Sequence, residues 1–133
     1  MNTLDAVITN IVFQESLCFL EIDAAGILLG ILLFDINPRF RVGCRVKVLF
    51  KETEVALAKG LAGEVSFSNC FPAIVTGIKS GCMLADITLK SAGGELNSII
   101  TVRAVAKLGL KMNDEVTVLI RASQLSLDAN LDD

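Results

Sequence analysis

The chain has no histidine, tryptophan or tyrosine, and its aromatic residues are seven phenylalanines among 133 residues. Without histidine, neither a Ser-His nor a Cys-His pair can activate a nucleophile. The four cysteines, Cys18, Cys44, Cys70 and Cys82, form no C-x-x-C pair, so no zinc site is expected. Recognisable pairs of catalytic carboxylates are also missing. We therefore expect a protein that is not an enzyme, with no metal cation or organic cofactor, and with buried, reduced thiols.

Runs of positive charge are missing as well. The chain carries 12 Lys and Arg against 15 Asp and Glu, and no basic run exceeds two residues. Phosphate backbones are held by clustered Lys and Arg, and single strands also by aromatic stacking. The sequence offers neither pattern, so we predict no nucleic-acid partner. A small anion is not excluded, because a few local donors can hold one.

No segment is long and apolar enough for a bilayer. The most apolar stretch, Ile27–Phe34, falls far short of the roughly 20 residues that a membrane helix needs. The first ten residues show no basic region followed by an apolar core, so no signal peptide is expected. We expect no membrane insertion and a cytoplasmic location. We also predict that this stretch forms a strand buried on both faces.

An internal repeat organises the chain. Residues 2–11 (NTLDAVITNI) match residues 69–78 (NCFPAIVTGI), which lie 67 positions later. Residues 48–57 (VLFKETEVAL) match residues 118–127 (VLIRASQLSL), which lie 70 positions later. Because both ends match in the same order, we interpret the chain as a duplication whose second copy has gained three residues in its middle.

Each copy is predicted to contain five short strands, because β-branched residues are abundant. The expected strands are residues 4–13, 17–23, 27–34, 45–50 and 54–57 in copy one, and 71–79, 83–89, 95–101, 115–121 and 124–127 in copy two. Residues 102–108 are predicted to form a short helix between an N-cap at Thr101 and a C′ glycine at Gly109. The expected fold class is all-β, with two tandem OB-like five-stranded barrel modules, the second carrying the helix.

Three segments of copy two carry a resemblance to a known family. Residues 66–73 (SFSNCFPA) follow the pattern Ser-Ala-Arg-Asn-x-Leu-x-Gly, and residues 100–110 (ITVRAVAKLGL) follow Ile-Thr-x-x-Ser-x-x-x-Leu-Gly-Leu. Residues 116–125 (VTVLIRASQL) follow Val-x-x-x-Ile-Lys-Ala-Ser-x-Val. These motifs resemble the Mop/TOBE molybdate-binding domain family, and the duplication resembles its tandem di-Mop proteins of the molbindin, or molybdenum-pterin-binding, type. On this basis we expect a degenerate module 1 (1–58), a linker (59–65) and a module 2 (66–133).

The resemblance implies a function. It implies binding of molybdate or tungstate as an oxyanion, without catalysis, for storage, homeostasis or delivery. It also implies a homo-oligomer, either dimer or trimer, and a molybdate transporter ATPase or a regulator as a possible partner. An alternative is a degenerate TOBE interaction or regulatory module that no longer binds the oxyanion.

The chemistry of molybdate indicates which side chains are needed. It is a tetrahedral dianion, so its site calls for hydroxyls, backbone N–H groups and a cation. A helix start presents free N–H groups and the positive end of the dipole. The residues that the resemblance assigns to the oxyanion are Ser66, Ser68, Thr101, Val102, Arg103, Arg121, Ala122 and Ser123 in copy two, with Lys51 and Thr53 in copy one.

Other interpretations stay open for several of these positions. Thr101 also fits a plain helix cap. Asn2 and Asn69, which recur in the repeat, are expected to satisfy local backbone groups. Copy two departs from the family pattern with Ser68 in place of Arg, Ala104 in place of Ser and Arg121 in place of Lys. In copy one Glu52 follows Lys51, and its charge would repel a dianion, so we expect the stronger site to depend on copy two.

Overall fold

The structure, a computed structural model, describes residues 1–128 and consists mainly of strands. The first half contains β1 (Asn2–Gln14), β2 (Leu17–Ala24), β3 (Ile27–Phe34), β4 (Arg45–Phe50), the 3₁₀ turn η1 (Glu52–Glu54) and β5 (Ala56–Ala58). The second half contains β6 (Asn69–Ser80), β7 (Leu84–Ser91), β8 (Gly94–Thr101), the helix α1 (Val102–Leu108), β9 (Glu115–Ile120), the 3₁₀ turn η2 (Ala122–Gln124) and β10 (Ser126–Asp128). The predicted all-β class with one short helix is confirmed.

The duplication is visible element by element. β1, β2 and β3 recur 67 positions later as β6, β7 and β8, and β4, η1 and β5 recur 70 positions later as β9, η2 and β10. Even an irregularity recurs, because β1 shifts register between Ile8 and Asn10 and β6 shifts between Val75 and Gly77. The three additional residues fall between β8 and β9, where copy two forms α1 and copy one has a loop.

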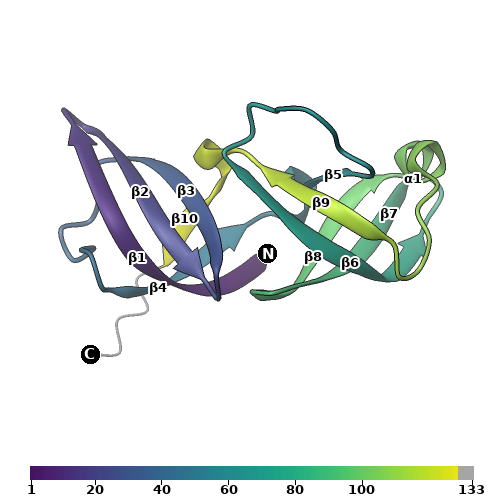
Figure 1. The fold of residues 1–133 in the computed structure, drawn as a ribbon, viewed down its shortest axis with the longest axis horizontal. Coiled ribbons are helices and arrows are strands. Elements are labelled where there is room, and N and C mark those ends of the chain that lie inside the picture. The colour runs from purple at the N-terminus through teal and green to yellow at the C-terminus, as the bar shows by residue number, and fades with distance from the viewer. Residues whose placement is uncertain (129–133) are drawn as a thin grey trace.

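The two halves exchange their last strands. One sheet has the order β10-β4-β1-β2-β3 and the other has the order β5-β9-β6-β7-β8. In the first sheet Ser126 of β10 lies opposite Leu49, and in the second Ala56 of β5 lies opposite Leu119. Figure 1 shows the result, two modules side by side with β10 in the first and β5 in the second. The predicted boundaries therefore separate the two sequence repeats, whereas each sheet contains strands from both repeats.

The hydrophobic core is continuous across the exchange. Side chains of β1 alternate between buried and exposed from Asn2 to Ile8, as expected for a strand with one face on the core. Buried residues of both sheets form one cluster, whose largest fully buried side chains include Phe50, Ile8, Leu20, Ile87, Leu96 and Ile120. A single barrel of about 60 residues is marginally stable, and the shared core gives each module the apolar partner that it needs.

Two asparagines join the modules through the backbone. The Asn69 side chain donates to the Gly30 carbonyl at 3.0 Å and accepts from the Gly30 N–H at 2.7 Å. The Asn2 side chain donates to the Asn97 carbonyl at 2.7 Å and accepts from the Asn97 N–H at 2.8 Å. The expectation that both asparagines serve local backbone groups is wrong, because each binds a strand of the other half.

Several finer expectations also need correction. β3 is buried on both faces only in its middle, since Leu28 is 73% exposed and Phe34 is 72% exposed. Cys18 and Cys44 are buried, and burial raises the pKa of the Cys18 thiol, but Cys70 and Cys82 are exposed. The strands expected at residues 54–57 and 124–127 begin two residues later, at Ala56 and Ser126, because η1 and η2 extend over the first residue of each segment.

Candidate functional site

The two 3₁₀ turns occupy equivalent places at the junction of the modules. Lys51 precedes η1 and Arg121 precedes η2, both with extended backbones at φ −75° and −74°. In each turn the N–H three residues later donates back at 3.0 Å, from Glu54 to Lys51 and from Gln124 to Arg121. η1 packs against β8 and η2 against β3, so each turn reaches across to the other half. The repeat thus places one cation at the start of each turn.

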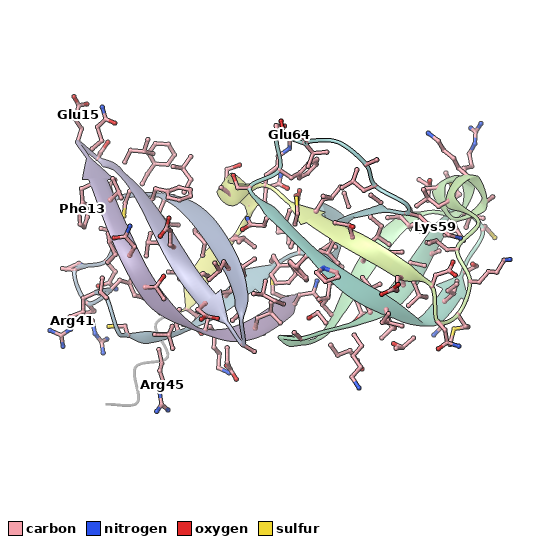
Figure 2. All side chains as sticks on the ribbon, in the orientation of Figure 1. Phe13, Glu15, Arg41, Arg45, Lys59 and Glu64 are labelled. Carbon is pink, nitrogen blue, oxygen red and sulfur yellow. The ribbon has the colours of Figure 1, made fainter. Side chains whose placement is uncertain are left out.

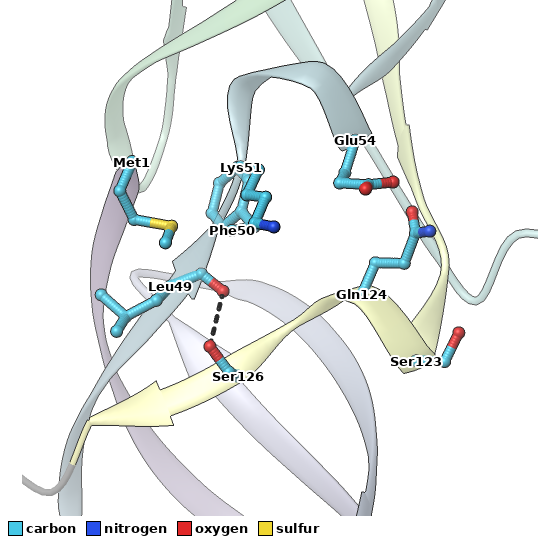
Figure 3. Close-up of a pocket in the computed structure, with 8 residues that line it drawn as sticks. All are labelled: Met1, Leu49, Phe50, Lys51, Glu54, Ser123, Gln124 and Ser126. Carbon is cyan, nitrogen blue, oxygen red and sulfur yellow. Dashed lines mark hydrogen bonds between the residues drawn. The ribbon is translucent and has the colours of Figure 1, made fainter.

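A pocket lies between η1 and η2 at this junction. It has a volume of about 290 Å³ and is open to solvent (Figure 3). The residues that line this junction pocket are Met1, Leu49, Phe50, Lys51, Glu54, Ser123, Gln124 and Ser126. Two of the predicted oxyanion residues, Lys51 and Ser123, therefore meet there, one from each half of the chain.

The polar lining of the junction pocket suits an anion with one exception. Lys51 supplies a cation, and Ser123 and Gln124 supply side-chain donors. Ser126 is already engaged in part, because its hydroxyl donates to the Leu49 carbonyl at 3.4 Å. The exception is Glu54, a residue with a carboxylate that lines the same pocket. Such a lining can hold a small anion through the Lys51 ammonium group and several neutral donors, against the repulsion of the Glu54 carboxylate.

The η1 turn carries a second carboxylate, that of Glu52, which is already paired. The Glu52 carboxylate accepts a hydrogen bond from the Met1 amino group at 2.5 Å and does not line the pocket. That hydrogen bond is the main reason why the pKa of Glu52 lies below its ordinary value. Thr53, the other predicted residue of this turn, is exposed and does not line the pocket either.

A second cluster forms around Arg121. Its guanidinium carbon lies 4.9 Å from the centre of the Phe67 ring, a cation–π distance. Phe67 stands between Ser66 and Ser68, so this contact brings the segment before β6 to the start of η2, where Ala122 follows. The structure therefore gathers the first and third family motifs of copy two in one place.

The second motif lies apart from this cluster. Thr101 caps α1, since its hydroxyl accepts from the Ala104 N–H at 3.0 Å, and Gly109 ends the helix at φ 58°. Both predicted caps are confirmed. The Val102 N–H already donates to the Met83 carbonyl at 2.8 Å. Figure 1 shows α1 at the outer end of the second module, so one chain does not bring Thr101, Val102 or Arg103 to Arg121.

Sequence reasoning missed most of the junction pocket. Glu54 and Gln124 carry a signal that could have identified them, because each follows a predicted cation by three positions in the repeat. No sequence signal identifies the other lining residues Leu49, Phe50 and Ser126, because Ser126 reaches the other two only through the exchange of β10. Within residues 1–128, no group of three or more Cys, Asp and Glu is placed to hold a metal ion. In the same range no helix is long and apolar enough to cross a membrane.

The exchanged sheets define a tandem OB-like β-barrel protein with a small polar pocket at the junction of its modules. A family model described as the TOBE domain matches residues 66–127. The chain is 33% identical over 64 residues to molybdenum-pterin-binding protein 1 of Clostridium pasteurianum, a match that covers 47% of this chain and 94% of that protein. The chain therefore belongs to the Mop/TOBE family, and the resemblance seen in its motifs is confirmed.

Two further comparisons cover both modules. The structure of the cytoplasmic molybdate-binding protein ModG, with molybdate bound, matches with a TM-score of 0.91 and 25% identity over 96% of this chain and 95% of that chain. The molybdenum import ATP-binding protein ModC of Brucella abortus (strain 2308) is 30% identical over 111 residues. That match covers 83% of this chain, which spans only 30% of the length of ModC.

Proposed function

We propose that this protein binds molybdate or tungstate as an oxyanion in the cytoplasm, for storage, homeostasis or delivery, without catalysis. The observation that carries the proposal is the likeness to ModG, which extends over 96% of this chain at a TM-score of 0.91. That protein is described as a cytoplasmic molybdate-binding protein and was solved with molybdate bound. The likeness includes both modules, so the proposal concerns the tandem unit rather than one barrel.

The local chemistry supports the same ligand. Lys51 and Ser123 meet in the junction pocket, and Arg121 lies beside the segment with Ser66 and Ser68. These groups are cations, hydroxyls and backbone N–H donors, which are the groups that a tetrahedral dianion binds. We include Ala122 and Thr53 as backbone or hydroxyl donors of the two turns. We also propose that the units of the sequence are module 1 (1–58), a linker (59–65) and module 2 (66–133).

We further propose that the site around Arg121 is completed by a second copy of the chain. Thr101, Val102 and Arg103 stand at the outer end of module 2, away from Arg121 in the same chain. The start of α1 can reach the Arg121 cluster only from a neighbouring copy, in a homo-oligomer such as a dimer or trimer. A closed ring of copies satisfies every such contact.

Isothermal titration of the full chain with molybdate, tungstate and sulfate tests the proposal, together with the mass in solution. We expect molybdate and tungstate to bind and the chain to be oligomeric. Molybdate at 100 times its Kd should raise the free energy of unfolding by about 2.7 kcal/mol. If protein first freed of bound anion gives neither heat nor a shift in Tm with molybdate or tungstate, the proposal is wrong.

A second function, an interaction or regulatory module without oxyanion binding, is favoured by two observations. Ser68 and Ala104 remove a cation and a hydroxyl from the family pattern. The chain also matches a transporter ATP-binding protein, ModC, over 83% of its own length. Affinity capture of a transporter ATPase or a regulator with equal yield in the presence and absence of molybdate would support this function over the first.

A further inference from the structure

Among the side chains that line the junction pocket, one is a cation and one is a carboxylate, Lys51 and Glu54. The amino group of Met1, which also lines the pocket, is paired with Glu52. Lys51 and Glu54 come from the same turn, in which the Glu54 N–H donates to the Lys51 carbonyl at 3.0 Å. Within residues 1–128 neither side chain forms a salt bridge. In the described part of the chain, the Glu54 charge is therefore not neutralised by an ion pair, and it acts directly on the contents of the pocket.

The repeat provides the neutral counterpart of this residue. Position 124 follows Arg121 as Glu54 follows Lys51, with the same backbone hydrogen bond at 3.0 Å, but it holds glutamine. Figure 3 shows the Glu54 and Gln124 side chains pointing toward one another across the pocket. The two positions share a local backbone and a similar side-chain length, and they differ by one negative charge.

We propose that Glu54 is an affinity-limiting residue of the junction pocket, whose charge weakens the binding of a dianionic oxyanion and favours its release. The inference rests on the proposed function. A carboxylate that lines a pocket of this size lies on the order of 5–8 Å from a bound ion. At that range, its repulsion of a dianion, screened by water and salt, corresponds to on the order of tenfold in Kd.

The experiment is isothermal titration of the full chain with molybdate at low and at high salt. We expect Glu54→Gln to bind about tenfold more tightly than the wild type and Gln124→Glu about tenfold more weakly. Both differences should shrink at about 1 M salt, because salt screens a charge effect but not a change in packing. The matched control is Glu15→Gln, which removes the same charge at the β1–β2 turn (Figure 2) and should leave Kd unchanged.

Each outcome decides the inference. Wild-type binding with the same Kd in Glu54→Gln would overturn the role of Glu54 and leave the proposed function standing. A shift in Kd that is equally large at both salt concentrations would also overturn it. Wild-type binding that becomes about tenfold tighter in Glu54→Gln at low salt, and less so at high salt, would support the inference. Absence of binding by all variants would overturn both the proposed function and the inference.

Discussion

The Asn69 side chain forms two hydrogen bonds with the backbone of Gly30, which lies 39 positions earlier in the other half of the chain. Asn69 is fully buried. Gly30 lies on β3, an edge strand, so no neighbouring strand of the sheet can pair with the N–H and carbonyl of Gly30 on the outer side. Asn2 and Asn97 repeat the arrangement between β1 and β8. One amide group thus replaces the missing strand at each edge and holds the modules together.

Replacing Asn69 should destabilise the whole chain. Asn69→Ala leaves the Gly30 N–H and carbonyl buried without partners, so we expect a loss of about 2–4 kcal/mol in the free energy of unfolding. Urea unfolding measures it. Asn10→Ala, at an exposed position of β1, is the control and should change the free energy by less than about 0.5 kcal/mol. Equal effects of the two variants would contradict this role of Asn69.

The pairing of Lys59 with Asp114 predicts a dependence of stability on pH. Lys59 follows β5, and its Nζ lies 2.9 Å from both the Asp114 carboxylate and the Gly109 carbonyl, so it fastens the exchanged strand to the second module (Figure 2). The hydrogen bond from Lys59, followed by one from the Lys111 N–H, lowers the pKa of Asp114. Because the folded pKa is lowered, this stabilisation is present above the unfolded pKa of about 3.9 and is lost as pH falls through the folded value.

Asp114→Asn should therefore be less stable than the wild type at pH 7, and the difference should vanish as the pH falls through the lowered pKa of Asp114. Urea unfolding from pH 7 to pH 2.5 measures the difference. Lys59→Met removes the main cause of the shift and should flatten the profile in the same way, with little further effect in the double variant. A constant difference between Asp114→Asn and the wild type at all pH values would contradict the pairing.

The cap of α1 can be tested separately from the proposed site. Thr101→Ala removes the acceptor for the Ala104 N–H, and we expect a loss of about 1 kcal/mol in the free energy of unfolding. Thr101→Ser keeps the hydroxyl and should stay within about 0.5 kcal/mol of the wild type. If a second copy places Thr101 at the Arg121 cluster, Thr101→Ala should also weaken molybdate binding. An unchanged Kd would contradict that part of the proposal.

The cation of the junction pocket should matter for binding. Lys51→Met keeps most of the side-chain length and removes the charge, so we expect about a tenfold rise in the Kd for molybdate. Lys47→Met is the control, since Lys47 pairs with Asp5 at 3.1 Å and does not line the pocket. Titration calorimetry at low salt compares the two variants. A larger effect of Lys47→Met than of Lys51→Met would place the ligand elsewhere.

The sequence by itself determined the elements and their order. Alternating apolar residues in β1 and β6, turn residues before β3 and β8, and the caps at Thr101 and Gly109 are local signals. They act within a few residues of the chain, so reading the chain in order is enough to find them. The repeat and the family motifs are linear patterns too, and the family that they indicated is confirmed.

The tertiary structure alone decided which half each final strand joins. β5 and β10 are three residues long and would pair equally well by pattern with either barrel, because the repeat makes β4 and β9 alike. The exchange depends on the path of the chain between modules, which has no periodic signal. The same exchange brings Ser123 and Gln124 to Lys51 and Glu54. Only the packing of the two modules shows that Asn69 binds the backbone of Gly30 in the other half of the chain and not a local backbone group. The site is therefore a product of long-range pairing, whereas its individual residue types were visible in the sequence.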